Sequence, residues 1–311
     1  MLGLGEYQPP DAVPSEQIAT RFGKSAQWVQ ERTGIESRRV AGPGETVREM
    51  AIAAGEDALK NADISAADID LVIVASCSVS EPLYGTAGHV AELLGAGRAA
   101  AFDLNSACAG FCYALAVASD TIRVGSATTV LVIGAEKMTA WVDQEDLGTS
   151  IIFGDGAGAA VVAATEEPGI GPVVWGSDGA QADAIHVAPE TGTMRMAGQT
   201  VFRWATSEMV AVAENACRRA GVEPDELAAI VPHQANLRIV DALVAKLGAP
   251  DAAVARDIVR SGNTSAASIP IALNRLLREG HPRPGGLALL IGFGAGLTYA
   301  AQVVRLPGKP G

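Results

Sequence analysis

The chain has 311 residues, a formal net charge of −12 and a hydrophobic fraction of 49 %, enough apolar material for a large core or two domains. The acidic balance argues against a nucleic-acid-binding protein, which needs a basic stripe to neutralise phosphates. No stretch reaches the roughly 18 uncharged apolar residues of a membrane span, and no signal peptide is visible at the N-terminus. The four cysteines do not form a disulfide framework in a chain of this length. We therefore expect a cytoplasmic protein with no membrane and no nucleic-acid partner.

Helical and strand patterns alternate along the chain, which indicates an α/β protein. The helical segments carry apolar residues at the 3.6-residue period. The strand segments are short apolar runs bounded by Gly, Pro or charged residues, which is typical of sheets covered on both faces. In chain order, we predict a helix over Glu45–Ala62, strands over Leu71–Ala75, Val130–Gly134 and Ala159–Ala163, a helix over Val201–Ala220, a strand over Ala229–Pro232, helices over Arg238–Leu247 and Ile269–Arg278, and strands over Leu287–Ile291 and Ala300–Val304.

Two parts of the chain match each other at a constant offset of 158 residues. Ala53 and Glu56 correspond to Ala211 and Glu214 at this offset, and the same register later pairs Ile133–Gly134 with Ile291–Gly292. Each matched unit is a helix, a short turn, an acidic loop and a strand. The match predicts two duplicated halves, 1–165 and 166–311, with the functional site where they meet.

Cys108 lies in the segment LNSACAGFCYALAVA, directly before an apolar helical run. Asn105 or Ser106 can cap this helix, and the helix N-terminus would then favour a thiolate and lower the pKa of Cys108. A buried structural cysteine is the alternative interpretation. Cys112 follows one helical turn later, but no histidine or further cysteine lies at ligand spacing, so we expect no metal site.

His233 follows a predicted strand in IVPHQANLR, and the carboxyl ends of strands are where open α/β sheets place their sites. Asn263, in SGNTSAASIPIALNRLL, precedes a helix as Cys108 does, and the duplication places it opposite Cys108 after a small shift in register. The alternatives are a histidine satisfied by neighbouring backbone and an asparagine that caps a helix. The halves therefore offer a thiol from one side and an imidazole and an amide from the other.

The glycine-rich strings GDGAGAA and GFGAG have neither the spacing of a dinucleotide-binding loop nor the Lys-Ser/Thr pair of a phosphate loop. We interpret them as turns at which two backbones approach closely. Accordingly, we expect no NAD, no ATP and no other cofactor.

Four segments in order, NSACAGFCYAL, PHQANLR, GNTSAASIP and IGFGAGLTYAAQVV, resemble β-ketoacyl-acyl-carrier-protein synthase III of the thiolase-like superfamily. The resemblance extends from Gly5 to Pro307, and the segments GSDGAQADAI and FGDGAGAAVV are similar to actinobacterial members. It implies a five-layered αβαβα fold with two duplicated halves, and a homodimer. It also implies that a short acyl group from coenzyme A is joined to malonyl-acyl carrier protein through a cysteine thioester, which gives 3-oxoacyl-acyl carrier protein and CO₂ and initiates fatty-acid synthesis.

The resemblance implies a role for each residue of the site. Cys108 falls on the acylated nucleophile, and His233 and Asn263 fall on the pair that stabilises the enolate left when malonyl thioester loses CO₂. The backbone N–H groups of Cys108 and Ala295 fall on the oxyanion hole. These roles agree with the residue chemistry, because both the attacked thioester and the enolate develop a negative oxygen that needs preorganised donors. An aspartate in place of Asn263 would repel that charge, so the asparagine favours carbon–carbon condensation.

Other positions match the family's substrate-binding surfaces. Trp28 offers a flat face for adenine and Arg32 a partner for phosphate, while Asn236 and Gly198 match positions along the pantetheine tunnel. The surface that would receive the acidic acyl carrier protein is matched by Gln234, Arg238, Arg203 and Lys246. For the arginines, a solvated surface charge is the alternative interpretation.

Two positions depart from the family pattern. Leu147 stands where the family usually has an arginine that helps to sandwich the adenine, so we expect coenzyme A to bind more weakly or differently. Leu83 lies in a primer-pocket loop that also differs from the commonest versions. We expect these two positions to bear on the choice of starter acyl group. A starter-unit ketosynthase of a polyketide pathway, and an acyltransferase to a hydroxyl or amine, are the alternative functions.

Overall fold

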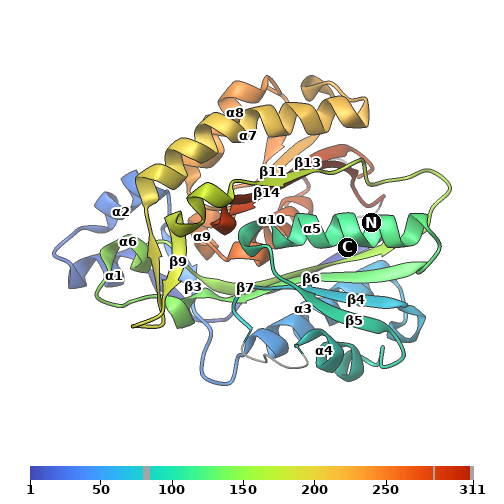
Figure 1. Cartoon of the computed structure of the whole chain (residues 1–311), viewed down its shortest axis with the longest axis horizontal. Coiled ribbons are helices and arrows are strands. Elements are labelled where there is room, and N and C mark those ends of the chain that lie inside the picture. The colour runs from blue at the N-terminus through green and yellow to red at the C-terminus, as the bar shows by residue number, and fades with distance from the viewer. Residues whose placement is uncertain (80–84, 283, 309–311) are drawn as a thin grey trace.

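Two five-stranded sheets with the same strand order form the framework of the molecule (Figure 1). The computed structural model describes residues 1–79, 85–282 and 284–308. The first sheet has the order β1 (Gly3–Tyr7), β7 (Asp155–Ala163), β6 (Thr129–Lys137), β4 (Leu71–Ala75), β5 (Ala100–Leu104). The second has the order β8 (Val174–Ser177), β14 (Thr298–Arg305), β13 (Leu287–Gly294), β11 (Ala229–Pro232), β12 (Ala253–Val254).

The pairing directions are also the same in the two sheets. In each, the first two pairs of neighbours run antiparallel and the last two run parallel. The strands of the first sheet end at Ala163 and those of the second begin at Val174. The duplication inferred from the repeated pattern is therefore present in the topology. The division at residue 165 falls between the two sheets, and that boundary stays a prediction.

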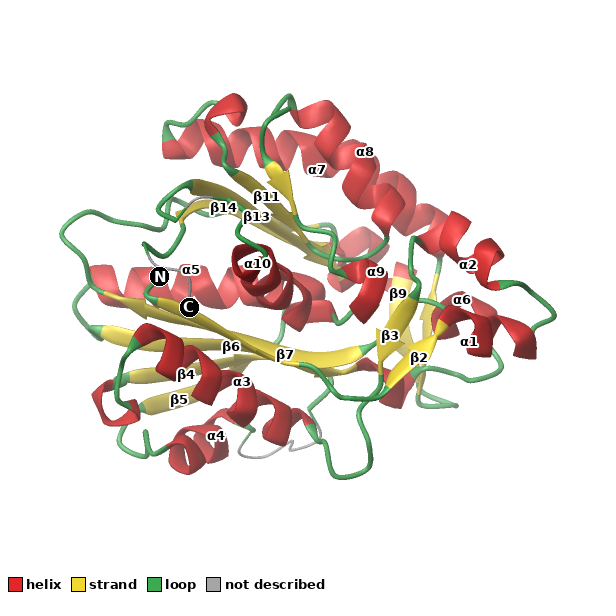
Figure 2. Cartoon of the chain, turned by 180° about the vertical axis from the view of Figure 1, so that it is seen from behind, coloured by secondary structure: helices red, strands yellow, loops and turns green. Residues whose placement is uncertain are grey.

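Helices complete five layers (Figures 1 and 2). Two helices, α5 (Gly110–Arg123) and α10 (Ser268–Arg278), lie between the sheets, and their buried residues form one core with both. The outer face of the first sheet is covered by α3 (Val47–Ala62) and α4 (Ala87–Leu94). The outer face of the second is covered by α7 (Gly198–Ala220) and α8 (Leu237–Leu247). The predicted αβαβα fold is confirmed.

The ten predicted elements all form, and β4 and β11 have the predicted bounds. Both are buried along their whole length, as central strands covered on two faces must be. The strands β6 and β13 continue beyond the predicted ends, to Lys137 and Gly294. Other strands were not predicted; β1, for example, has the sequence GLGEY, in which glycine and glutamate interrupt the apolar pattern.

Short elements gather at one end of the molecule (Figures 1 and 2). They include two small two-stranded sheets. The elements are β2 (Ala12–Pro14), α1 (Ser15–Arg21), α2 (Ala26–Thr33), β3 (Ser37–Arg39), α6 (Leu147–Ser150), β9 (Ile185–Ala188), β10 (Thr193–Met196) and α9 (Ile258–Ser261). Residues of several of them line the cavity described below. Across the described ranges, no helix combines the length and apolarity that crossing a bilayer requires.

Candidate active site

A cavity of about 800 Å³ lies between the two halves. Cys108 from the first half and His233 and Asn263 from the second all line it. Most of its remaining wall is apolar. The structure therefore brings together the three residues that sequence analysis selected for catalysis.

Cys108 lies in a short 3₁₀ turn, Ala107–Ala109, that leads into α5. Neither Asn105 nor Ser106 caps α5: its N-cap position is Ala109, which has no side-chain bond. The Oδ1 atom of Asn105 accepts instead from the N–H of Ala107, at 3.1 Å. The predicted cap is therefore wrong, and Asn105 shapes the turn before the nucleophile.

The expectation of a lowered thiol pKa is also wrong for the free protein. Cys108 is only 9 % exposed, and burial raises the pKa of its thiol to about 12, against a lowering by Ser265 and a further raising by Glu136. Loss of hydration of the thiolate on burial is the largest contribution to this pKa. At neutral pH the resting nucleophile is a thiol.

His233 follows the last residue of β11 and is 1 % exposed. Its backbone N–H donates to Ile291 O at 2.7 Å, and its Nδ1 lies 2.7 Å from Ser268 Oγ. Burial lowers the pKa of His233 to about 3, so the imidazole is neutral. Because Ser268 Oγ accepts from the N–H of Gln234 at 3.3 Å, its own hydrogen is available to Nδ1. When Ser268 Oγ donates to Nδ1, the ring hydrogen lies on Nε2, and that atom is then a donor.

Asn263 is held by its backbone and by one side of its amide. Its N–H donates to Ile152 O at 2.9 Å and its carbonyl accepts from Gly154 N at 3.0 Å. Its Oδ1 accepts from Ser265 N at 2.9 Å, which identifies the other amide atom as the donor Nδ2. The N-cap position of α10 is Ala267 rather than Asn263, so the alternative of a simple helix cap does not apply.

The turns before α5 and α10 are copies of one another. Asn105 and Asn263, which are 158 residues apart, each accept a backbone N–H from the residue two positions later. Those residues, Ala107 and Ser265, both have positive φ, 45° and 48°. The structural counterpart of Asn263 is therefore Asn105, and the expected shift in register that would pair it with Cys108 is wrong.

A glycine lies directly against the nucleophile at the end of β13. A Cβ atom on Gly294 would lie 2.9 Å from Cys108 Sγ, closer than non-bonded carbon and sulfur approach. The next residue, Ala295, lines the cavity. The close contact explains the glycine-rich string GFGAG, and the role of the Ala295 N–H in an oxyanion hole stays a prediction.

Glu136, which sequence analysis did not select, is completely buried at the end of β6. It accepts hydrogen bonds from the segment Ser76–Ser78, and from Ser265 Oγ at 3.0 Å. The Cys77 thiol lies 3.3 Å from Glu136 Oε1 and also lines the cavity. A charged residue at the end of an otherwise apolar strand was the sequence feature that could have drawn attention to Glu136.

Arg32 and Asn236 line the cavity. The Arg32 guanidinium lies 3.8 Å from the centre of the Trp28 ring, so one face of the indole is already covered. Asn236 caps α8 by accepting from Arg238 N at 2.9 Å, and its Nδ2 donates to Arg32 O at 3.0 Å. Gly198, at the start of α7, lines the same cavity. The assignment of these residues to coenzyme A and pantetheine stays a prediction.

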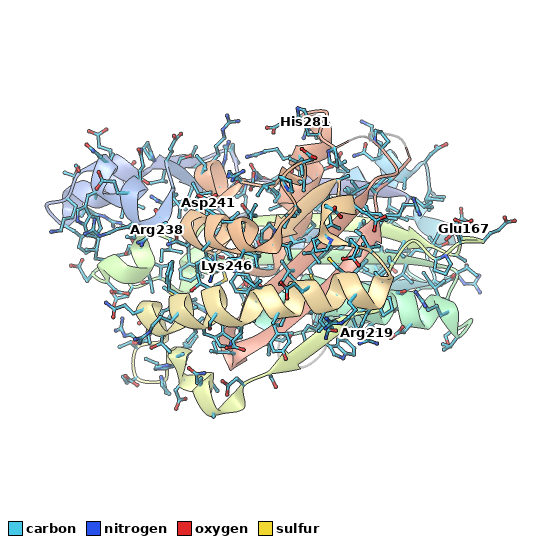
Figure 3. All side chains as sticks on the ribbon, turned by 90° about the horizontal axis from the view of Figure 1, so that it is seen from above. Glu167, Arg219, Arg238, Asp241, Lys246 and His281 are labelled. Carbon is cyan, nitrogen blue, oxygen red and sulfur yellow. The ribbon has the colours of Figure 1, made fainter. Side chains whose placement is uncertain are left out.

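Three of the predicted carrier-protein contacts are exposed cations. Arg203 and Arg238 line the cavity. Lys246 lies further along α8, where Figure 3 shows it together with Arg238 and Asp241. Its Nζ donates to Thr206 O on α7, at 2.8 Å.

Gln234 is wrongly assigned to the carrier-protein surface. It is 0 % exposed. Its Nε2 donates to Pro232 O and Ala255 O, and its Oε1 accepts from Ile258 N. A side chain whose polar atoms are all bound to buried backbone cannot contact a docked protein.

Leu147, one of the two positions expected to bear on the starter group, is not among the described residues that line the cavity. Leu83 lies outside the described residues. Leu147 starts α6 and packs into an apolar cluster with Ile18, Val29 and Trp28. The apolar wall of the cavity contains residues that were not predicted, among them Cys77, Met138, Trp141, Met194 and Met196.

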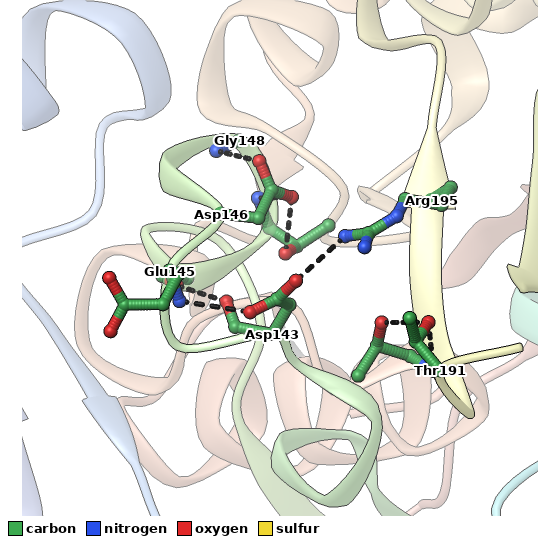
Figure 4. A network of polar contacts seen from close by, with 9 residues as sticks. Asp143, Glu145, Asp146, Gly148, Thr191 and Arg195 are labelled. Atoms are coloured by element: carbon green, nitrogen blue, oxygen red, sulfur yellow. Dashed lines mark hydrogen bonds and ion pairs between the residues drawn. The ribbon is translucent and has the colours of Figure 1, made fainter.

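The loop that carries Leu147 is pinned to the β9–β10 hairpin (Figure 4). Arg195 on β10 pairs with Asp143 at 3.0 Å. Asp146 caps α6 by accepting from Gly148 N and Thr149 N. Leu147 is therefore set in place by its neighbours on both sides, and it contributes apolar packing where an arginine was expected.

A thiol, a neutral imidazole and a primary amide at the junction of two duplicated halves define a thiolase-like condensing enzyme. Two family models match the chain: 3-oxoacyl-[acyl-carrier-protein] synthase III over residues 102–179 and its C-terminal model over residues 217–306. The chain belongs to the 3-oxoacyl-[acyl-carrier-protein] synthase III family.

Relatives match over nearly the full length. β-Ketoacyl-[acyl-carrier-protein] synthase III 4 of Streptomyces coelicolor is 50 % identical, over 98 % of this chain and 97 % of the relative. The synthase III of Mycobacteroides abscessus is 48 % identical, over 100 % and 95 %. Among solved structures, the priming β-ketosynthase of the R1128 polyketide pathway has a TM-score of 0.95 at 44 % identity, over 98 % and 95 %. The synthase III of Aquifex aeolicus has a TM-score of 0.93 at 40 % identity, over 98 % of both chains.

Proposed function

We propose that this enzyme condenses an acyl group from coenzyme A with malonyl-acyl carrier protein and so initiates fatty-acid synthesis. The observation that carries the proposal is the convergence of Cys108, His233 and Asn263 on one cavity with Arg32, Arg203 and Arg238 in its wall. Arginine is suited to the phosphates of coenzyme A and to an acidic carrier protein.

In the first half-reaction, the Cys108 sulfur attacks the carbonyl carbon of the acyl thioester. The bond from that carbon to the coenzyme A sulfur breaks, and the proton lost by Cys108 ends on the coenzyme A thiol. The carbonyl oxygen becomes negative in the intermediate. The backbone N–H groups of Cys108 and Ala295 are the donors we assign to it, because preorganised donors stabilise such an oxygen.

In the second half-reaction, malonyl thioester loses its carboxylate as CO₂. The electron pair of the broken C–C bond forms an enolate, whose oxygen receives hydrogen bonds from His233 Nε2 and Asn263 Nδ2. The enolate carbon then attacks the acyl carbonyl, the bond to Cys108 sulfur breaks, and the thiolate takes up a proton from water. Two neutral donors suit this step, because they stabilise the anion without a charge that must be kept in a buried site.

The proposed partners are acyl carrier protein, coenzyme A thioesters and a second copy of the chain. The homodimer is supported by β5, which forms an outer edge of the first sheet and carries Phe102 with 41 % exposure. An open edge with an exposed aromatic side chain can pair with a copy of itself. All four cysteines are free thiols, which supports a reducing, cytoplasmic setting.

A second candidate function is the priming of a polyketide, favoured by the likeness to the R1128 priming ketosynthase. The chemistry is the same, and the difference lies in the starter and the carrier protein. Three methionines in the apolar wall, Met138, Met194 and Met196, would adapt to starters of different shape.

The experiment is intact-protein mass after incubation with acetyl-, isobutyryl-, hexanoyl- and malonyl-coenzyme A, with Cys108→Ala as the control. We expect a gain of one acyl group in the wild type and none in the variant. The acylated enzyme is then mixed with malonyl-acyl carrier protein, and CO₂ and 3-oxoacyl product are measured. An unchanged condensation rate in Cys108→Ala would overturn the proposal, and turnover only with a polyketide carrier protein would select the second candidate.

A further inference from the structure

A carboxylate from the first half is buried against the loop that positions Asn263 in the second half. Glu136 Oε1 accepts from Ser265 Oγ at 3.0 Å and from Ala266 N at 3.4 Å. On its other side it accepts from Ser76 Oγ at 3.1 Å and from the backbone N–H groups of Cys77 and Ser78. Glu136 thus joins the ends of two strands of its own sheet to a loop of the other half.

Ser265 connects this carboxylate to the amide of Asn263. Its N–H donates to Asn263 Oδ1 at 2.9 Å, while its hydroxyl donates to Glu136. Ser265 has a φ of 48°, a conformation that residues with a Cβ atom adopt at a cost and hold only when their surroundings impose it. The bonds from Ser265 and Ala266 to Glu136 are contacts able to impose it.

The duplication shows that this contact is particular to one half. At the constant offset, the counterpart of Glu136 is Gly294, and Gly294 lies against Cys108 as Glu136 lies against Ser265 and Ala266. The counterpart of Ser265 is Ala107, which has the same positive φ but no hydroxyl. The strand that faces the turn of Asn263 therefore carries a buried carboxylate, where the strand that faces the turn of Cys108 carries a glycine.

We propose that Glu136 is a positioning residue for the decarboxylating half-reaction, because it holds Ser265 in the conformation that turns Asn263 Nδ2 toward the bound thioester. This inference rests on the proposed function. It assigns Glu136 no contact with substrate: it acts through Ser265 on the donor that stabilises the enolate.

An amide cannot replace this carboxylate. Both of its oxygens accept from backbone N–H groups, Oε1 from Cys77 and Ala266 and Oε2 from Cys77 and Ser78, so the NH₂ group of a glutamine would face an N–H group in either orientation. The charge of Glu136 also raises the pKa of Cys108. Glu136→Gln therefore changes the two half-reactions in opposite directions: it weakens the hold on Asn263 and makes the Cys108 thiolate easier to form.

The test measures the two half-reactions separately in the full-length enzyme. Acylation is followed by the mass of the protein after mixing with the acyl-coenzyme A that labels the wild type, and decarboxylation by CO₂ release from malonyl thioester. We expect Glu136→Gln to acylate at least as fast as the wild type at pH 7, with its pH profile moved to lower pH. We expect its CO₂ release to fall at least tenfold.

Two variants of Ser265 test the backbone argument. Ser265→Ala loses the bond to Glu136 but retains the Cβ atom, so we expect CO₂ release to fall as in Glu136→Gln. Ser265→Gly also loses the hydroxyl, but glycine adopts a positive φ freely, so we expect it to recover part of that loss. Asp70→Asn is the matched control. Asp70 accepts from Thr128 and Thr129 at the opposite end of β6, so the same chemical change there should leave both rates unaltered.

The outcomes separate a positioning role from a structural one. If Glu136→Gln leaves the ratio of the two half-reaction rates unchanged, for example by lowering both rates by the same factor, the inference is overturned while the proposed function stands. The same holds if Ser265→Gly is as impaired as Ser265→Ala. If Glu136→Gln does not fold, as judged by circular dichroism and thermal unfolding, the Ser265 pair decides alone. A wild type that neither acylates nor releases CO₂ overturns the proposed function, and the inference with it.

Discussion

Gly294 and Cys108 touch across the junction of the two halves, and the contact leaves no room for a side chain on the glycine. A Cβ atom on Gly294 would lie 2.8 Å from Cys108 Cβ and 2.9 Å from its sulfur. A second glycine of β13 also allows the two backbones to pack closely, because a Cβ atom on Gly292 would lie 2.8 Å from the Cα atom of Ala109. The turn that carries the nucleophile, Ala107–Ala109, therefore packs directly against β13 of the opposite half.

Gly294→Ala should disable the nucleophile more than it disturbs the fold. The added methyl group must push Cys108 from its position, and displacement of a reacting atom by an ångström costs on the order of 100-fold in rate. We expect acylation by acyl-coenzyme A, measured by intact mass, to fall by about that factor.

Gly88→Ala is the matched control for this substitution. Gly88 lies in α4, and a Cβ atom there would meet no atom of the described residues within 4 Å. It should acylate normally and gain up to about 1 kcal/mol in the free energy of unfolding, because alanine favours a helix over glycine. Normal acylation by Gly294→Ala would contradict the conclusion that contact with Gly294 fixes the position of Cys108.

His233 should make the protein less stable as the pH falls below 6.5. Its pKa is 6.5 when exposed and about 3 in the folded protein, so between these values the unfolded chain binds a proton that the folded chain does not. Its contribution is complete above pH 6.5 and is lost as the pH falls, at roughly 1.4 kcal/mol per pH unit. His233→Gln should therefore lose less stability between pH 6.5 and 4.5 in urea unfolding. Equal slopes for the two proteins would argue against a buried neutral imidazole.

The resting thiol of Cys108 should react slowly with alkylating reagents. Because burial raises its pKa to about 12, and the thiolate is the reactive form, the rate of alkylation by iodoacetamide should rise roughly tenfold per pH unit from pH 7 to 10 without a plateau. Alkylation at Cys108 is read by peptide mass, with Cys108→Ala as the control. A plateau below pH 8 would mean that the helix N-terminus outweighs burial after all.

Substitution of Gln234 should lower the stability of the fold, whereas substitution of Arg238 should weaken the use of carrier protein. Gln234→Ala removes the hydrogen bonds that its side chain makes to buried backbone groups of Pro232, Ala255 and Ile258, so we expect a loss of about 2–4 kcal/mol in the free energy of unfolding. Arg238→Ala should alter stability by less than about 0.5 kcal/mol and raise the KM for carrier protein several-fold. A stable Gln234→Ala with a raised KM would restore the sequence-based assignment.

Much of the architecture could be predicted from local patterns. The strands β4 and β11 are continuous apolar runs, and the repeat at a constant offset predicted two like halves without any knowledge of their contacts. The strand β5 escaped prediction because it lies at the edge of its sheet and none of its residues is buried, so its sequence is less constrained by the core. The strand β1 escaped because glycine and glutamate interrupt its apolar pattern.

The catalytic trio could be predicted because Cys108, His233 and Asn263 each follow or precede a recognisable element, in segments that resemble a known family. Their state could not be predicted in the same way. The same sequence position that suggested a low thiol pKa is enclosed in the folded protein, and enclosure depends on which distant segments cover it.

The sequence by itself determined the class of fold, the duplication and the identity of the three candidate catalytic residues. These features depend only on short segments and on the order of those segments along the chain. Only the tertiary structure decided that Cys108 rests as a thiol, that Gln234 is buried, and that Glu136 holds a loop 129 residues away through Ser265. The physical reason is that burial and long-range hydrogen bonds belong to pairs of segments, and a pair exists only after the chain has folded.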